Sequence, residues 1–124
     1  MVREEIKKQV EIAVLEEFQI KVSEIQIEKP QNKQWGEYSC NVAFKLAKQI
    51  GKSPVDIASI ISTNIQNRTI KSLHGWDAPL IDSVSFVAPG FINFKISKLA
   101  LLEFASKLIE NPKQARSVYN TVTP

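Results

Sequence analysis

The sequence predicts one α+β domain in which a small, mostly antiparallel or mixed sheet packs with about four helices. Helix-like and strand-like stretches are mixed along the 124 residues without the strict alternation of a parallel βαβ sheet. Hydrophobic residues make up 44% and charged residues 23% of the chain, which is typical of a globular protein. The length suits a single domain that folds without disulfides or metal.

Four helices are expected where apolar residues recur at three- and four-residue steps. They are predicted over residues 3–18, about 38–50, about 54–66 and about 98–111. Gly51 is placed to end the second helix in the left-handed conformation that glycine favours. Ser53 is placed to cap the third helix, with Pro54 at its first position.

Strands are expected where apolar and polar residues alternate. They are predicted around Ile25 and Ile27 and over residues 81–88 and 91–97. Pro89-Gly90 joins the last two strands and suits the centre of a type II turn, although that turn is not the preferred hairpin connection. Polar, glycine- and proline-rich composition predicts connections over residues 30–36 and 67–79.

The remaining composition limits where the protein works and what it contacts. No continuous apolar run resembles a secretory signal or a membrane span, so a cytoplasmic location without membrane contact is expected. The net charge of +3 permits contact with a polyanion without requiring it. The domain is expected to cover residues 1–112, and the tail 113–124, which lacks an apolar period, to be a linker.

The sequence predicts no catalytic residues, no metal ligands and no cofactor site. His74 is the only histidine, with no nucleophile or acid at a recognisable spacing. One cysteine and one histidine supply no metal-ligand cluster, and Cys40 is expected to be a small core residue. There is no glycine-rich phosphate loop. An independent enzyme is therefore not expected.

The segment 91–96 presents two different faces when read as a strand. The expected core face is Ile92, Phe94 and Ile96, and the opposite face is Phe91, Asn93 and Lys95. The opposite face spans about 13 Å. Its ring could stack on an unpaired base, its amide could read a base edge, and its ammonium could meet phosphate. The alternative is that the ring packs beneath a helix and the amide satisfies backbone groups near a turn.

Two motifs resemble the N-terminal accessory domain of arginyl-tRNA synthetases, a class I family. The first is Trp35-Gly36-Glu37-Tyr38-Ser39-Cys40-Asn41-Val42-Ala43-Phe44-Lys45-Leu46-Ala47-Lys48, followed by Gly51-Lys52-Ser53-Pro54. The second is Pro89-Gly90-Phe91-Ile92-Asn93-Phe94. The two motifs together, in this order and at this spacing, are specific, and the resemblance covers roughly residues 1–112. In the first motif we expect Gly36, Glu37, Tyr38 and Asn41 to have structural roles rather than RNA contacts, with Tyr38 and Asn41 joining the loop to the sheet.

The resemblance implies a tRNA-binding accessory domain that contacts the D-loop of the arginine tRNA near base 20. The aromatic and amide positions that make this contact in the family match Phe91 and Asn93, and Lys95 lies beside them on the strand. Ala88 stands where some relatives carry a further polar side chain, so no third base contact is expected there. The implied partners are the arginine tRNA and a catalytic domain beyond the tail. No DNA partner is expected.

The resemblance also implies that this chain does not catalyse the ligase reaction itself. The class I signature His-any-Gly-His is not supplied by Leu73-His74-Gly75-Trp76. The second signature, Lys-Met-Ser-Lys, cannot occur because Met1 is the only methionine. The ATP that a parent arginine–tRNA ligase uses should therefore not bind here.

Two other functions remain open at the level of sequence. In the first, the domain is a structural or protein-interaction module that supports the catalytic core, and Phe91 lies in a protein interface. In the second, it is a small-ligand sensor, although no phosphate loop or polar cluster favours that. Steep weakening of binding with salt distinguishes an RNA-binding domain from an apolar protein contact.

Overall fold

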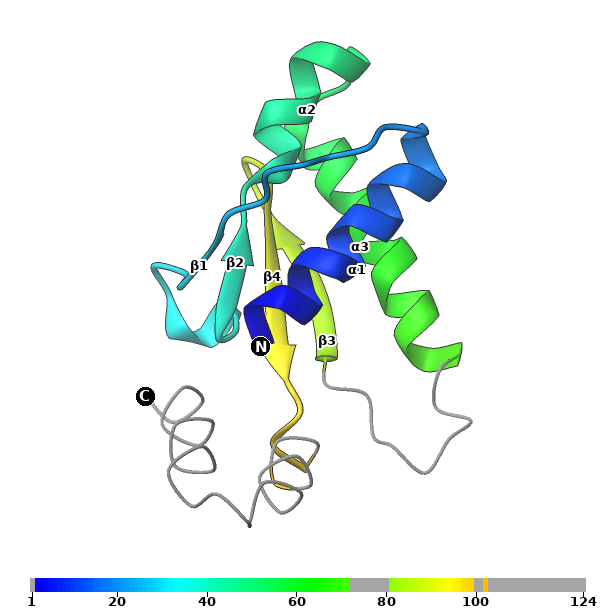
Figure 1. The fold of residues 1–124 in the computed structure, drawn as a ribbon. Coiled ribbons are helices and arrows are strands. Elements are labelled where there is room, and N and C mark those ends of the chain that lie inside the picture. The colour runs from blue at the N-terminus through cyan, green and yellow to red at the C-terminus, as the bar shows by residue number, and fades with distance from the viewer. Residues whose placement is uncertain (1, 72–80, 100–101, 103–124) are drawn as a thin grey trace.

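The computed structural model describes residues 2–71, 81–99 and 102 (Figure 1). Its elements in chain order are α1 (Val2–Phe18), β1 (Ile27–Glu28), the short 3-10 helix η1 (Lys33–Trp35), β2 (Tyr38–Cys40), α2 (Val42–Ile50), α3 (Pro54–Lys71), β3 (Ile81–Val87) and β4 (Phe91–Ile96). The α+β class is confirmed, with three α-helices in the described ranges, slightly fewer than the four predicted. Lys98, Leu99 and Leu102 are helical, and the rest of the fourth predicted helix and the tail 113–124 lie outside the described residues.

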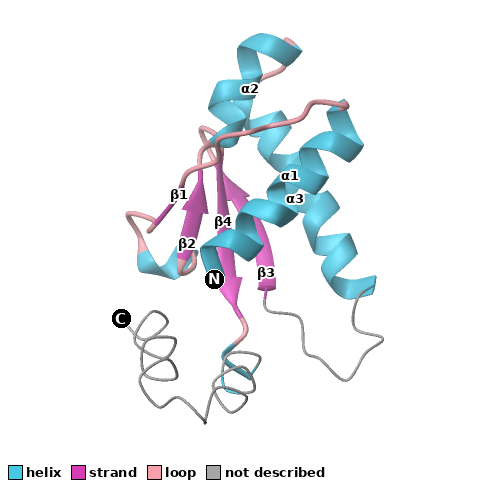
Figure 2. Cartoon of the chain, in the orientation of Figure 1, coloured by secondary structure: helices cyan, strands magenta, loops and turns pink. Residues whose placement is uncertain are grey.

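The four strands form one antiparallel sheet in the order β1-β2-β4-β3. β4 therefore pairs on both sides, with Tyr38 opposite Phe94 on one side and Val84 opposite Phe94 on the other. The helices pack against one face of this sheet (Figure 2). The other face, which we call the outer face, carries the second set of alternating side chains.

The prediction of a helix over residues 38–50 was wrong at its start. Residues 38–40 form β2, and the helix begins only at Val42. β2 is only three residues long, so the alternation of Tyr38, Ser39 and Cys40 is too short to mark it as a strand. Pairing with β1 and β4 satisfies its backbone groups and outweighs the helical spacing of its apolar residues.

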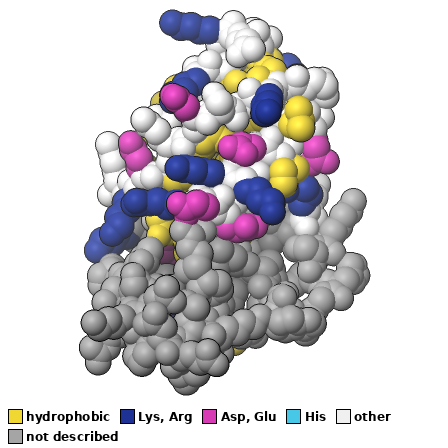
Figure 3. Space-filling view, in the orientation of Figure 1, with side chains coloured by type: hydrophobic (Ala, Val, Ile, Leu, Met, Phe, Trp, Pro, Cys, Tyr) yellow, Lys and Arg dark blue, Asp and Glu magenta, His cyan; other side chains and the backbone are white. Residues whose placement is uncertain are grey.

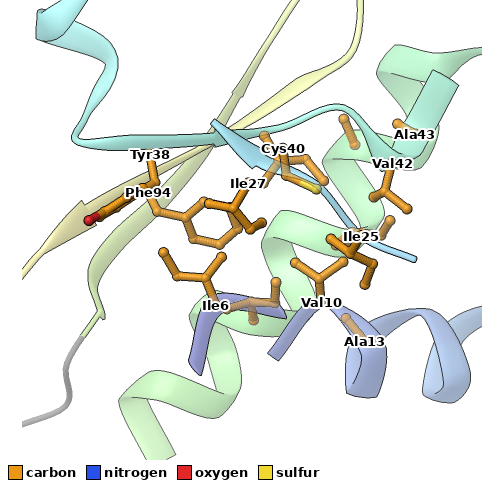
Figure 4. Close-up of a cluster of buried hydrophobic side chains, with 14 of the residues drawn as sticks. Ile6, Val10, Ala13, Ile25, Ile27, Tyr38, Cys40, Val42, Ala43 and Phe94 are labelled. Atoms are coloured by element: carbon orange, nitrogen blue, oxygen red, sulfur yellow. The ribbon is translucent and has the colours of Figure 1, made fainter. Parts of the chain in front are cut away.

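The core lies between the sheet and the helices (Figure 4). α1 contributes Ile6, Val10, Ala13 and Val14, α3 contributes Ile57, Ala58, Ile61 and Ile65, and the sheet contributes Tyr38, Cys40, Ile92, Phe94 and Ile96. Burying a single large side chain such as Phe94 contributes roughly 1.5–3 kcal/mol to folding. None of the helices in the described ranges combines the length and apolar character that a membrane span requires.

Local signals at the helix ends are confirmed, whereas the predicted type II turn is not. The Ser53 Oγ accepts a hydrogen bond from the Asp56 backbone N–H at 3.3 Å, and Gly51 ends α2 with a φ of 80°. Gly90 lacks the positive φ that a type II turn needs. Gly90 instead allows a close approach, since a Cβ there would lie 2.6 Å from the Pro54 Cβ.

Arg68 of α3 holds α1 in place through its guanidinium group. Its Nη1 donates to the side-chain oxygen of Gln9, and its Nη2 donates to the Gln9 backbone carbonyl at 2.6 Å. Its Nε lies 2.8 Å from the Asn64 Oδ1 and 3.3 Å from the Glu16 Oε1. Because these groups occupy the guanidinium, we assign Arg68 to helix packing.

The free edge of β3 is closed by a side chain from the helical layer. The Gln66 Oε1 of α3 accepts a hydrogen bond from the Val84 backbone N–H at 2.8 Å. A register irregularity between Ile81 and Ser83 also interrupts regular pairing at this end of the strand. Phe86, on the core-side face of β3, is 43% exposed.

The buried thiol of Cys40 makes the stability of the fold depend on pH. Burial raises the pKa of Cys40 from 9.0 to about 11. Because the thiolate is disfavoured in the folded state, this contribution to stability is fully present below about pH 9 and is lost as the pH rises through about 11. A shift of this size corresponds to roughly 2–3 kcal/mol.

We therefore expect the free energy of unfolding to fall between about pH 9 and about pH 11, and to fall less steeply in a Cys40→Ala variant. Urea unfolding of both proteins across this pH range measures the difference between their free energies of unfolding. Lysines and tyrosines titrate in both proteins, so their contribution cancels in the comparison. Equal slopes for the two proteins would show that the thiol does not contribute.

Candidate nucleic-acid interface

The three residues predicted to contact RNA share the outer face of β4, but they differ in exposure. Phe91 is half-buried, Asn93 is buried with 2% of its surface exposed, and Lys95 is exposed. The core-side residues Ile92 and Phe94 have no exposed surface, so the predicted division into two faces is confirmed. In this conformation only the ring and the ammonium group are open to a ligand.

Asn93 lies in a polar row that crosses the sheet. Its cross-strand neighbours are Ser39 of β2 and Ser85 of β3, and Ser39 is paired in turn with Glu28 of β1. The Asn93 Oδ1 is buried and has no hydrogen-bond partner in the described part of the chain. A buried amide oxygen without a partner costs about 1–3 kcal/mol.

A surface pocket of about 340 Å³ lies beside Phe91. It is lined by Gln26, Glu28, Lys29, Pro30, Gln31, Trp35, Ser39, Asn41, Ala88, Pro89 and Phe91. The lining combines two aromatic rings, three carboxamides, one lysine and one carboxylate, that of Glu28. Sequence reasoning predicted an RNA contact only for Phe91 among these residues, because most of the others come from segments that only the sheet brings together. A tryptophan beside Gly36 in an otherwise polar loop was the one available signal.

The ring of Phe91 is fixed from the side of α2. Its centroid lies 5.2 Å from that of Phe44, with the two ring planes at 68°, an edge-to-face contact. The predicted alternative, that this aromatic packs against a helix, is therefore partly correct. Because Phe91 also lines the pocket, helix packing orients the ring without removing it from the surface.

Trp35 is held by the short helix η1. The Asn32 side chain caps this helix by accepting from the Gln34 backbone N–H at 2.9 Å. The backbone N–H of Trp35 donates to the Asn32 carbonyl at 3.0 Å, and that of Gly36 donates to the Lys33 carbonyl at 3.2 Å. These bonds fix the backbone that carries the half-buried indole.

The next two residues attach this loop to β4. The Glu37 backbone N–H donates to the Phe94 carbonyl at 2.9 Å, and the Glu37 Oε2 accepts from the Ile96 backbone N–H at 3.0 Å. Gly36 has φ 134° and ψ −172°, a conformation that is essentially restricted to glycine. A Cβ on Gly36 would lie 2.5 Å from the Phe94 carbonyl oxygen. Gly36 and Glu37 thus have the structural roles expected.

Tyr38 is also structural. Its side chain is 1% exposed, and the Arg3 guanidinium lies 5.7 Å from its ring centroid. Burial raises the pKa of Tyr38. The side chain therefore connects the start of α1 to the sheet through a cation–π contact.

Charge is not concentrated on the helical side of the molecule. Figure 3 shows basic and acidic side chains interspersed over the described part of the face that carries α1. On the other side, Lys29 and Glu28 are exposed at the pocket, and Lys95 is exposed on the outer face. Across the described ranges, no three His, Cys, Asp or Glu side chains gather as metal ligands, and His74 lies outside them.

The architecture defines the class of domain. Its fold is found in solved arginyl-tRNA synthetases. The Thermus thermophilus enzyme matches with a TM-score of 0.60 and 21% identity, over 85% of this chain and 16% of the enzyme. The Plasmodium falciparum enzyme matches with a TM-score of 0.65 and 21% identity, over 85% of this chain and 18% of that enzyme.

The sequence specifies the family. Residues 1–96 match the family model described as "Arginyl tRNA synthetase N terminal domain", and the chain belongs to this family. The arginine–tRNA ligase of Prosthecochloris aestuarii is 33% identical over 73% of the chain, and that of Listeria monocytogenes serotype 4b is 36% identical over 90%. The chain spans 15% and 18% of the length of these two relatives, respectively.

We expect Gly36→Ala to destabilise the domain by about 3 kcal/mol or more, because it adds both backbone strain and a clash with β4. Gly51→Ala is the matched control: Gly51 also has a positive φ, but a Cβ there meets nothing within 4 Å. Its cost should be about 1 kcal/mol. Urea unfolding measures both, and equal losses would contradict the proposed close contact.

Proposed function

We propose that this chain is a tRNA-binding domain of an arginine–tRNA ligase and contacts the D-loop of the arginine tRNA near base 20. The observation that carries the proposal is the half-buried ring of Phe91, which lines a pocket of mixed apolar and polar residues on the outer face of the sheet. Membership of the family and the similarity to ligases supply the context. We expect the protein to work in the cytoplasm.

Phe91 supplies stacking in this proposal. An unpaired base has an apolar face that can lie on the ring, and a contact of this kind is worth about 1–3 kcal/mol. The edge-to-face contact with Phe44 already orients the ring, so little conformational freedom is lost when a base binds. The ring therefore provides a binding surface formed in advance.

Lysines beside the ring supply attraction to phosphate. Lys29 lines the pocket, and Lys95 lies about 13 Å from Phe91 along β4. Each ammonium group that neutralises a phosphate releases a counterion, which favours binding and makes it depend on salt. This contribution positions the RNA without reading its sequence.

Asn93 does not fit a direct reading role in the conformation described, because only 2% of its surface is exposed. For the amide to touch a base, the side chain or its surroundings would have to move. Phe91 and Lys95 carry the proposal without such a change.

Within the ligase, the domain would supply binding energy and orientation far from the reacting groups, while a catalytic domain of the same protein uses ATP and arginine. Such energy raises the rate only if it positions the tRNA in the transition state. Leu99 and Leu102 are 62% and 57% exposed and lie one helical turn apart. This exposed pair favours an additional supporting role, an apolar contact with the rest of the ligase.

We expect Phe91→Ala to weaken binding of the arginine tRNA by about 5- to 150-fold, the equivalent of 1–3 kcal/mol. Phe86→Ala is the matched control, because Phe86 is 43% exposed on the core-side face of the same sheet. NMR titration of each variant with the arginine tRNA measures the affinity. A second titration, with the same tRNA carrying another base at position 20, tests whether that base is the one bound. Equal affinities for both variants would rule out stacking on Phe91.

Salt dependence distinguishes the proposal from a purely supporting role. We expect the logarithm of the association constant to fall linearly with the logarithm of salt concentration, and Lys95→Gln to lower that slope by nearly one. Lys48→Gln, on the exposed face of α2, should leave the slope unchanged. The absence of salt-dependent binding would favour the supporting role instead.

A further inference from the structure

A second amide, that of Asn41, lies on the pocket that Phe91 lines, and it does not cap the helix that it precedes. Asn41 stands at the N-cap position of α2, with φ −109° and ψ 19°. An asparagine at this position usually accepts a hydrogen bond from a backbone N–H of the first helical turn. The Asn41 side chain makes no such bond. It is half-buried and lines the pocket with Phe91 and Trp35.

The chemistry of this free amide suits a base edge. A carboxamide offers one acceptor oxygen and two N–H donors, which can pair with adjacent donor and acceptor groups of a nucleobase. Gln26 and Gln31 also line the pocket, but both are exposed and have longer side chains that lose more freedom on binding. Asn41 is short and fixed between β2 and α2.

Trp35 adds a second aromatic surface to the same pocket. Its loop is capped by Asn32 and attached to β4 through Glu37, so the backbone that carries the indole is fixed before any ligand arrives. The pocket therefore presents aromatic groups from two separate elements, η1 and β4, together with the amide of Asn41. Asn93, buried beside Ser39, contributes no accessible amide.

We propose that Asn41 reads the edge of the base that binds beside Phe91, and that Trp35 supplies a second stacking surface for it. This inference rests on the proposed function, since it requires that an unpaired base enters this pocket. Base selectivity resides at the junction of β2 and α2.

The test compares binding of this chain to the arginine tRNA and to the same tRNA with another base at position 20. Asn41→Ser removes the amide but retains a side chain that can cap α2. We expect it to reduce the ratio of the two affinities by about 5- to 150-fold. Asn67→Ser, at an exposed position of α3, is the matched control and should leave the ratio unchanged.

Trp35 provides a second, independent measurement. In a Trp76→Phe background, Trp35 is the only tryptophan of the chain. Its fluorescence should change when the arginine tRNA binds, and should not change with a tRNA that lacks the base at position 20. Trp35→Leu should weaken binding of the intact tRNA but not of the abasic one. This measurement keeps the inference testable if Asn41→Ser folds poorly.

The outcomes separate the two proposals. If Phe91→Ala abolishes selectivity while Asn41→Ser and Trp35→Leu leave affinity and selectivity intact, the inference is wrong and the proposed function stands. Loss of selectivity in Asn93→Ser, with Asn41→Ser normal, would likewise overturn the assignment of Asn41. If the unaltered chain binds the tRNA without distinguishing position 20, or does not bind it, the proposed D-loop function fails and the inference fails with it.

Discussion

The pairing of β4 on both of its edges is the constraint on which the rest of the structure depends. Its core-side residues Ile92 and Phe94 are fully buried. The backbone of the same strand pairs with β2 and β3, and its Phe94 carbonyl also accepts the Glu37 N–H. A single strand thus joins the core, the η1 loop and the outer face. Displacing β4 would disturb all three together. A side chain at position 36 would require such a displacement, because its Cβ would collide with the Phe94 carbonyl oxygen.

The pocket follows from this arrangement because it forms where separate segments meet the start of β4. Phe91 begins the strand, η1 is attached farther along it, and Asn41 follows the strand paired beside it. None of these segments forms a binding surface alone. Polar groups of the helical layer are engaged in packing, as the hydrogen bonds of Arg68 to Gln9 illustrate. The pocket on the outer face, in contrast, leaves side chains available to a ligand.

Much of the fold could be predicted from sequence because its signals are local. The periodicity of α1, the Ser53 cap and the alternation in β4 depend on neighbouring residues, and the structure confirms them. β2 could not be predicted, because an alternation of only three residues is too short a signal and pairing with β1 and β4 makes the segment a strand. Motif resemblance identified the family and Phe91, but burial of Asn93 and the contribution of Trp35 depend on tertiary packing.

The hydrogen bond between Gln66 and the Val84 N–H has a consequence for how the domain meets other polypeptides. An open strand edge invites a foreign strand to extend the sheet, which leads to unwanted self-association. Here a helix of the same chain occupies a backbone donor at that edge, and the opposite edge strand, β1, is only two residues long. Neither side is a good template for strand addition. This arrangement favours contacts through side chains with a neighbouring domain or another copy, and side-chain chemistry discriminates between partners as backbone pairing does not.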